Sequence, residues 1–186
     1  MNPNLVQLAL LAALSAPAAH AVEYRSVLPK QSAIQFEFRQ MGVPVKGGFK
    51  RFTTQMTFDP AKPEAARAQI EIDLASIDAG SPEADEESAG KLWFNRSAYP
   101  KAAFVSGQIR ALGNNRYEMR GTLTLKGRSR EMVVPVSFSP GKNAATFDGG
   151  FVLRRLDFGI GEGIWADVAT VANEVQVKFR IAATGN

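Results

Sequence analysis

From about residue 30 onward, the sequence alternates again and again between apolar and polar residues with a period of two. The stretch Ile34-Gln35-Phe36-Glu37-Phe38 shows this pattern early in the chain, and Val175-Gln176-Val177-Lys178-Phe179 shows it near the end. A period of two places successive side chains on opposite faces of a strand, so each stretch predicts a strand with one buried face. Because no strand–helix–strand rhythm interrupts the pattern, an all-β fold is expected.

About eight such stretches follow one another at close spacing, which favours an antiparallel barrel or sandwich. Gly42 and Gly47-Gly48 are expected to interrupt the chain between the first two strands, and Pro63 is expected to begin a single helical turn. A hairpin turn is expected at Lys126-Gly127-Arg128-Ser129. The expected strands cover residues 34–38, 52–58, 68–74, 117–125, 132–138, 147–153 and 175–181, and one more begins at Phe104.

One stretch, from Asp73 to Phe104, breaks the alternation. Ser81 and Pro82 form a helix-start signal, with serine as the N-cap and proline as the first helical residue. We expect the acidic residues that follow to be solvated charges that the helix dipole favours; a catalytic carboxylate cluster is the alternative. Leu92-Trp93-Phe94 then forms an apolar cluster. The stretch therefore predicts a helical flap across the all-β body, with its aromatic residues facing what the body holds.

The composition excludes several kinds of chemistry. The chain has no cysteine, and its one histidine is His20. If the first 21 residues are removed, the remaining chain has no thiolate or imidazole metal site and no Ser-His-Asp or Cys-His nucleophile. The net charge of +4 comes from 22 basic and 18 acidic residues spread along the chain, so nucleic-acid binding is not indicated. A weak attraction to an anionic membrane surface or headgroup remains open.

The first 21 residues have the features of a secretory signal. Leu5 to Leu14 is an apolar run too short to span a bilayer, and Ala19-His20-Ala21 fits a small-x-small cleavage site. The usual lysine or arginine near the N-terminus is missing, and a retained membrane anchor is the alternative. We expect cleavage after Ala21, export of the protein, and a single domain over residues 22–186.

The inward face of the expected strands carries large apolar side chains. A barrel of this size either fills its interior with side chains or holds one small ligand. Roughly eight-residue strands at about 3.3 Å per residue would make a tube about 25 Å deep, which suits a long, thin, apolar ligand. From the alternation alone, an ordinary packed aromatic core is the favoured interpretation.

Several short motifs, taken together in their order and spacing, resemble those of the YceI family of bacterial periplasmic proteins. The resemblance covers essentially the whole chain after the signal. It implies an eight-stranded antiparallel lipocalin-like barrel with a short covering helix, and a polyisoprenoid or isoprenoid quinone type of lipid bound inside. The motifs are Ile34–Phe38 with Gly42, Gly48–Phe52, Phe58–Pro60, Asp73–Asp78, Tyr99–Phe104, Gly121–Gly127, Arg155–Ile160 and Val171–Val175.

On this resemblance, we expect a non-enzymatic periplasmic carrier without a cofactor or metal. Many members carry a histidine just before the Gly42 position and another on the flap, where this chain has Gln40-Met41 and Asp85–Leu92. Headgroup or metal contacts that depend on those histidines are therefore in doubt. The expected ligand-binding residues are Phe36, Phe38, Phe52, Met56, Phe58, Ile70, Ile72, Ile77, Leu92, Trp93, Phe94, Phe104, Tyr117 and Met119.

Two other functions remain open. One is a structural or partner-binding periplasmic β-domain with a packed core. The other is an enzyme acting on an apolar substrate, for which Asp73, Asp78 and Asp157 would be the first candidates, although aspartates at strand ends commonly cap turns. The sequence also leaves open a homodimer and a transient contact with an inner-membrane protein or the membrane surface.

Two further motifs carry weaker expectations. Because neighbouring side chains in a strand point to opposite faces, Arg154-Arg155 allows one inward arginine that would meet an anionic headgroup; a surface or salt-bridged arginine is the more common case. The glycine-rich segment Gly159–Gly163 is expected to be a hairpin end, because no clear helix follows it to hold a phosphate.

Overall fold

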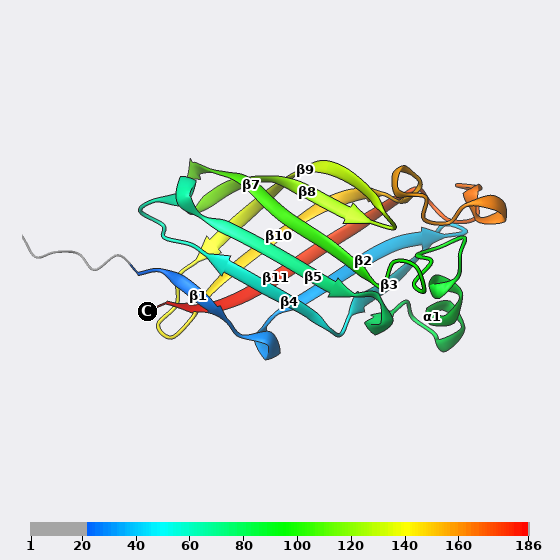
Figure 1. Cartoon of the computed structure of the whole chain (residues 1–186), viewed down its shortest axis with the longest axis horizontal. Coiled ribbons are helices and arrows are strands. Elements are labelled where there is room, and N and C mark those ends of the chain that lie inside the picture. The colour runs from blue at the N-terminus through cyan, green and yellow to red at the C-terminus, as the bar shows by residue number, and fades with distance from the viewer. Residues whose placement is uncertain (1–21, 186) are drawn as a thin grey trace, which may run out of the picture.

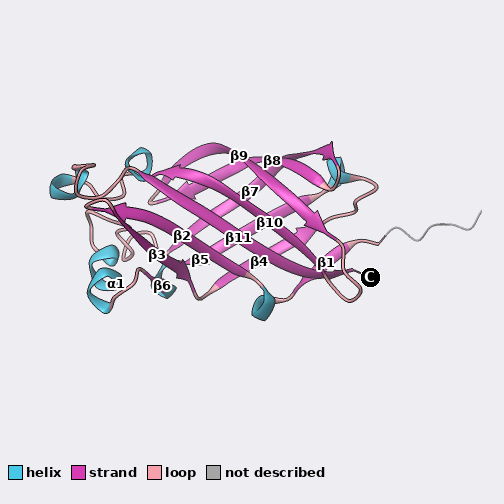
Figure 2. Ribbon diagram, turned by 180° about the vertical axis from the view of Figure 1, so that it is seen from behind, coloured by secondary structure: helices cyan, strands magenta, loops and turns pink. Residues whose placement is uncertain are grey.

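The computed structural model describes residues 22–185 of the chain, so the predicted signal and its cleavage site lie outside the described residues. Strands dominate, as the alternation predicts (Figures 1 and 2). The strands are β1 (Tyr24–Val27), β2 (Ala33–Gln40), β3 (Val43–Phe49), β4 (Phe52–Thr57), β5 (Arg67–Asp73), β6 (Ile77–Asp78), β7 (Lys101–Gly113), β8 (Arg116–Leu125), β9 (Arg128–Ser139), β10 (Ala145–Arg154) and β11 (Glu174–Gly185). The helical elements are α1 (Pro82–Ala89) and the 3-10 helices η1 (Pro29–Gln31), η2 (Pro63–Ala65), η3 (Leu74–Ser76), η4 (Arg155–Phe158) and η5 (Gly163–Ala166).

All strands belong to one antiparallel sheet that curls into a barrel-like body. Their order is β4-β5-β7-β8-β9-β10-β11-β2-β3-β6, and β1 pairs with β11. At one end of the body β1 also reaches β4, because Tyr24 and Phe58 exchange backbone hydrogen bonds of 2.8 and 3.1 Å. The predicted fold class is confirmed. The sheet has eleven strands rather than eight, because β1, β3 and β6 pair in addition to the predicted strands.

The expected interruption at Gly47-Gly48 is wrong, because both residues lie inside β3. Gly47 pairs directly with Phe36 of β2. A Cβ atom at Gly47 would overlap the Phe36 ring and the carbonyl oxygen of Asp78. The glycine is therefore needed for close packing within the sheet, and it does not break the strand.

Aromatic side chains close the barrel at the end where β1 lies. Phe58 packs against four other rings, with centroid separations from 5.0 to 6.5 Å. All five side chains are buried. We call this group the aromatic plug; its members are Tyr24, Phe58, Tyr117, Phe138 and Phe147.

The opposite end carries α1, as Figures 1 and 2 show. The predicted helix start is confirmed, because the Ser81 hydroxyl accepts a hydrogen bond of 3.2 Å from the Ala84 amide and Pro82 opens the helix. The predicted turns at Pro63 and at Lys126-Gly127 are confirmed as well. We call residues 79–100, which include α1, the flap.

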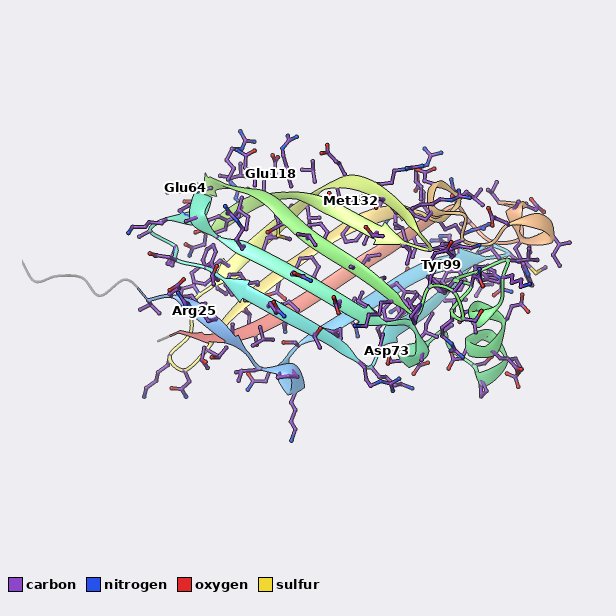
Figure 3. The ribbon with its side chains drawn as sticks, viewed as in Figure 1. Arg25, Glu64, Asp73, Tyr99, Glu118 and Met132 are labelled. Atoms are coloured by element: carbon purple, nitrogen blue, oxygen red, sulfur yellow. The ribbon has the colours of Figure 1, made fainter. Side chains whose placement is uncertain are left out.

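The outer face of the barrel is polar, and residues such as Arg25 and Glu118 lie on it (Figure 3). Glu118 alternates in β8 with the buried residues Tyr117 and Met119, as period-two alternation requires. Among residues 22–185, no helix is long and apolar enough to cross a membrane.

Candidate functional site

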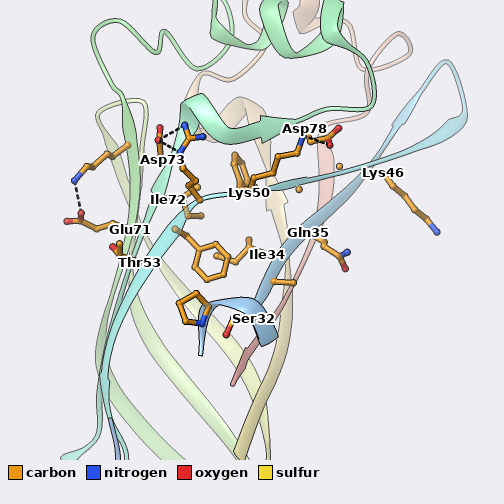
Figure 4. Close-up of a pocket in the computed structure, with 18 residues that line it drawn as sticks. Ser32, Ile34, Gln35, Lys46, Lys50, Thr53, Glu71, Ile72, Asp73 and Asp78 are labelled. Carbon is orange, nitrogen blue, oxygen red and sulfur yellow. Dashed lines mark hydrogen bonds and ion pairs between the residues drawn. The ribbon is translucent and has the colours of Figure 1, made fainter. Parts of the chain in front are cut away.

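A large cavity lies between β2–β3 and β4–β5 (Figure 4). Its volume is about 970 Å³. Ile34 and Phe49 line it from β2 and β3, and Phe52 and Ile72 line it from β4 and β5. Because these apolar side chains belong to the inward faces of the four strands, the cavity gives access to the interior of the barrel.

The cavity exists because β4 is an edge of the sheet. β4 pairs with β5, and among the described strands it forms no ladder with β2 or β3. Two closures join the sides of this gap: the Tyr24–Phe58 bridge at the plug end, and the β3–β4 turn, where the Lys50 amide donates to the Ser76 carbonyl at 3.0 Å. Between these closures, the described strands leave the wall unpaired.

The cavity lies at the edge of the sheet and is lined by side chains from both of its faces. Neighbouring residues in a strand point to opposite faces. The lining includes inward-facing Ile34 and Phe52 together with their outward-facing neighbours Gln35 and Thr53. Both faces of the sheet therefore contribute to the same opening. We call this opening the lateral opening.

Ion pairs lie along the side of the lateral opening that faces the flap (Figure 4). Their lengths are 2.8 to 2.9 Å, and in each the hydrogen bond from the base lowers the pKa of the carboxyl group. All three acids therefore stay ionised at neutral pH. The pairs are Lys50–Asp78, Arg51–Asp73 and Lys101–Glu71.

A second, smaller cavity of about 60 Å³ lies deeper, next to the aromatic plug. Thr54 and Met56 of β4 contribute to its lining. The Thr54 hydroxyl oxygen is buried and has no hydrogen-bond partner among the described residues. Leaving such a group unpaired costs about 1–3 kcal/mol, so a polar ligand atom or a water there would be stabilised. Since Phe52, Thr54 and Met56 share the inward face of β4, both cavities lie along one apolar track.

Inward-facing glycines keep aromatic rings flat against the wall. At three positions a Cβ atom on the glycine would overlap a phenylalanine ring from a neighbouring strand. The rings therefore occupy the space above the glycines instead of reaching across the interior. The pairs are Phe36 with Gly47, Phe104 with Gly121, and Phe179 with Gly149.

A row of phenylalanines connects the flap half of the interior with the lateral opening. The rings of Phe38 and Phe36 lie 6.3 Å apart, and those of Phe36 and Phe49 lie 5.5 Å apart. All three face inward but are only half-buried. Large apolar side chains that face an interior and still keep solvent contact indicate unfilled space.

Arg155 is the central residue at the flap end of the barrel. It is 1% exposed, and its five N–H groups donate to the carbonyl oxygens of Ile160, Gly161, Trp165, Val171 and Ala172 at 2.6 to 3.0 Å. Burial lowers the pKa of its guanidinium group, which nevertheless stays protonated.

These contacts differ from both alternatives that the sequence left open for Arg155. An inward arginine is present, but Arg155 has no N–H group left for an anionic headgroup. Arg154 is exposed, with its guanidinium 3.8 Å from the Asp157 carboxylate. Arg155 instead folds the β10–β11 loop, residues 155–173, back onto itself.

The flap and the β10–β11 loop contact each other at the end of the barrel opposite to the plug. The Leu92 carbonyl accepts hydrogen bonds of 2.8 Å from the amides of Gly161 and Glu162. The Trp165 indole donates to the Glu87 carboxylate at 2.9 Å, and the Trp93 ring lies 5.6 Å from the Trp165 ring. We call this set of contacts, together with Arg155, the polar clasp. It covers the end of the barrel opposite to the plug.

The predicted ligand-binding residues fall into four groups, and their contact with a ligand stays a prediction. The lateral opening is lined by Phe52 and Ile72, and the smaller cavity by Met56, Phe58, Ile70, Tyr117 and Met119. On the walls of the interior lie Phe36, Phe38, Ile77 and Phe104. On the flap lie Leu92, Trp93 and Phe94.

The flap residues differ in their surroundings. Leu92 is 39% exposed and lies next to Gly163 of the β10–β11 loop. Trp93 packs 5.7 Å from the Arg155 guanidinium, and its indole nitrogen is buried without a hydrogen-bond partner among the described residues. Phe94 packs against the core. Trp93 and Phe94 are thus better placed than Leu92 to reach the interior.

The aspartates considered for catalysis are used in structural contacts. Asp73 caps η3 through the Ala75 amide at 2.8 Å and also pairs with Arg51. Asp78 pairs with Lys50. Asp157 is exposed beside Arg154. Within residues 22–185, no group of three or more His, Cys, Asp or Glu side chains is arranged to hold a metal ion.

The sequence prediction missed Ile34, Phe49 and Phe179, which line the two cavities. Ile34 and Phe179 belong to stretches whose alternation already placed them on the inward face. Phe49 was hidden because the glycines before it were interpreted as a break. Reading β3 as Val43, Val45, Gly47 and Phe49 on one face would have identified it.

Comparison with known proteins agrees with this architecture. A family model described as the YceI-like domain matches residues 26–183. A UPF0312 protein of Pseudomonas savastanoi is 32% identical over 171 residues, covering 86% of this chain and 88% of the relative. A UPF0312 protein of Vibrio cholerae is 31% identical over 171 residues, covering 86% and 89%.

Solved structures show the same fold. The crystal structure of Burkholderia cenocepacia BcnA is 42% identical, with a TM-score of 0.83, and the match covers 86% of this chain and 100% of that one. A polyisoprenoid binding domain from Saccharophagus degradans, described as implicated in plant cell wall breakdown, has a TM-score of 0.64. It is 15% identical, with 90% of this chain and 100% of that one covered, so it supports the fold alone.

Proposed function

The chain belongs to the YceI-like family, and on this premise we propose that it is a periplasmic, non-enzymatic carrier for a long apolar lipid held inside the barrel. The observation that carries the proposal is the apolar track along β4. Phe52 lines the large cavity, and Thr54 and Met56 line the smaller one. A thin chain lying along this track would cover inward-facing residues that are now only half-buried.

The shape of the interior favours a linear tail over a compact ligand. The phenylalanine rings that lie over Gly47, Gly121 and Gly149 leave room along the wall, and the aromatic plug closes one end. A polyisoprenoid or isoprenoid quinone tail is long, thin and apolar, as this space requires. The Saccharophagus domain of the same fold is described as polyisoprenoid binding, which is consistent with this class of ligand.

A role without catalysis is supported by the state of the acidic side chains. The aspartates near the opening are held in ion pairs and a helix cap, where their pKa values are lowered. A general acid or base needs a pKa near the working pH. Acids held fully ionised are suited to binding and structure.

Mass spectrometry of the protein purified from periplasm without detergent tests the carrier role. We expect a copurifying lipid whose mass fits a prenyl chain, and a mature chain that begins at Val22. A protein that stays empty, both as purified and after incubation with geranylgeraniol, contradicts the carrier role. A chain that keeps its first 21 residues contradicts the predicted cleavage.

A substitution on the apolar track provides a sharper test. Met56→Glu places a charge in an apolar cavity, so retained geranylgeraniol should fall by about tenfold or more. The matched control is Gln55→Glu, because the neighbouring side chain points outward and is exposed. Circular dichroism would confirm that both variants fold. Equal retention by the two variants would show that Met56 does not contact the tail.

A further inference from the structure

We propose that the lateral opening between β2–β3 and β4–β5 is the portal through which the lipid enters and leaves, and that the uncharged polar end of the lipid rests there. The inference depends on the proposed carrier function. It adds the route of entry and the orientation of the ligand. The flap, which covers one end of the barrel, is then a fixed cover and not a gate.

Both ends of the barrel are closed by packed side chains. At the plug end, Phe58 and Phe147 are 4% and 7% exposed and their ring centroids lie 5.0 Å apart. At the flap end, Phe158 and Ile160 are 2% and 4% exposed beneath the polar clasp. A tail passing through either end would have to displace buried side chains.

Opening the flap end would break the contacts that join the flap to the β10–β11 loop. The Leu92 carbonyl would lose its hydrogen bonds from the Gly161 and Glu162 amides, and the Trp93 ring would leave the Arg155 guanidinium. Each such hydrogen bond contributes about 0.5–1.5 kcal/mol, so their simultaneous loss is unfavourable. The lateral opening needs no such rupture, because the described strands form no ladder across it.

Apolar and charged side chains are separated around the lateral opening. Ile34 and Ile72 lie in its inner part, while the ion pairs lie at its rim (Figure 4). Phe49 and Phe52 add to the apolar lining. An amphiphile whose tail follows the β4 track would therefore leave its polar end at this rim.

The charges of the rim indicate the kind of polar end that fits. Each of its three acids is paired with a base at 2.8 to 2.9 Å. Lys46 also lines the opening, but its side chain points away from the cavity in Figure 4. A phosphate at this rim would have to compete with a carboxylate for its base. A hydroxyl or carbonyl group would bond to the rim without breaking a pair, so an uncharged head is favoured.

Thiol labelling tests the portal directly, because the chain has no natural cysteine. Thr53→Cys places one thiol at the lateral opening, where the residue is exposed. Ile164→Cys places one on the β10–β11 loop at the flap end, where the side chain is 80% exposed. Each variant is labelled with a bulky polyethylene glycol maleimide, and the rate of geranylgeraniol uptake is compared with that of its own unlabelled form.

We expect the adduct at residue 53 to slow uptake and release by about tenfold or more, and the adduct at residue 164 to leave both rates unchanged. If only the adduct at residue 164 slows uptake, the entrance lies at the flap end, and the proposal that the lateral opening is the portal is wrong. Equal slowing at both sites, or at neither, would overturn it as well. If the unlabelled proteins take up no lipid, the carrier function itself fails, which is a different result from a portal in the wrong place.

The orientation is tested with the unlabelled wild-type protein and two ligands that share one tail. Geranylgeraniol should bind more tightly than geranylgeranyl phosphate at low ionic strength, where any attraction to the rim is least screened. Equal affinity, or tighter binding of the phosphate, would contradict an uncharged head at the ion-paired rim.

Discussion

At the plug end of the barrel, aromatic rings pack against one another, whereas at the flap end two segments are joined by hydrogen bonds to buried polar groups. Phe58 represents the first kind of closure, with four aromatic neighbours and 4% exposure. The second kind combines Arg155, which holds its own loop together through five carbonyl oxygens, with the Leu92 carbonyl of the flap, which accepts from two amides of that loop. Burial of apolar surface is non-directional and stabilises the whole fold, while a hydrogen-bonded cluster fixes one local geometry.

The plug contributes mainly to the stability of the fold, whereas the polar clasp keeps one end of the interior closed to a ligand. The plug gathers residues from β1, β8, β9 and β10 around Phe58, which follows β4 directly, so it links distant strands into one cooperative unit. The polar clasp links the flap to the β10–β11 loop and holds a cover in place. Between them, the half-buried phenylalanines of β2 and β3 contribute less to stability than to the lining of the interior.

The largest effect is expected from Phe58→Ala. Loss of a buried phenylalanine with a cavity left behind costs about 3–5 kcal/mol of unfolding free energy. The matched control is Phe38→Ala, which removes an inward but half-buried ring at the other end. We expect it to cost about 1 kcal/mol, in proportion to the smaller buried area. Denaturant unfolding measures the loss of unfolding free energy in both variants. Equal losses would contradict the proposed difference between the plug and the interior.

The next largest effect is expected from Arg155→Met, which fills similar space but leaves buried carbonyl oxygens unpaired. We expect a loss of at least about 2 kcal/mol, appearing first as faster hydrogen exchange in the flap and the β10–β11 loop. Arg154→Met is the control, because an exposed ion pair contributes little. If hydrogen exchange instead becomes faster throughout the described strands, including β1 and β4, the polar clasp stabilises the whole fold and not only the flap end.

Gly149→Ala is expected to reduce the free space inside the barrel. The new Cβ would overlap the Phe179 ring and push it into the barrel, so overpacking should cost about 1–3 kcal/mol and reduce retained geranylgeraniol. Gly107→Ala in β7 is a fitting control, because its nearest neighbour would be 3.7 Å away. Lipid extraction followed by mass spectrometry compares the two. Unchanged retention in Gly149→Ala would mean that the tail does not pass Phe179.

The smallest effect is expected from lowering the pH. A hydrogen bond from Lys126 lowers the pKa of the Glu162 carboxyl below its ordinary value of 4.5, and the charge of Arg128 adds to this. Because the folded pKa is the lower one, the stabilisation is complete above pH 4.5 and is lost as the pH falls through the folded value.

Limited proteolysis between pH 6 and pH 3 should therefore show the β10–β11 loop loosening before the plug. Glu162→Gln removes the titrating group, so its loop should be cleaved with less dependence on pH in this range. The contrast between the two ends would be refuted if the plug region became accessible at the same pH as the loop, or if the variant kept the full pH dependence.

Much of the fold could be predicted because its signals are local. Alternation along Ile34 to Phe38 placed the same residues inward that the structure places there, and Ser81-Pro82 located the helix start to the residue. The aromatic content of the interior was predicted for the same reason. The glycines of β3 were misinterpreted, because their role depends on a ring from another strand.

The site could be predicted only in part. Phe52, Met56 and Ile72 were identified from alternation, and they do line the cavities. Which end is packed, which end is covered and where the wall is open depend on how a curled sheet meets itself. The sequence allowed one arginine of the pair to face inward, but the carbonyl oxygens that surround Arg155 come from a loop whose path it does not specify.

By itself, then, the sequence determined the strands, their inward faces and the flap, because a period of two and a helix cap act between neighbouring residues. Only the tertiary structure decided that β4 remains an edge facing β2 and β3 across the lateral opening. The physical reason is that the pairing of two edges is set by the curl and stagger of the whole sheet. No single segment carries that information, and it is this gap that gives the interior its proposed entrance.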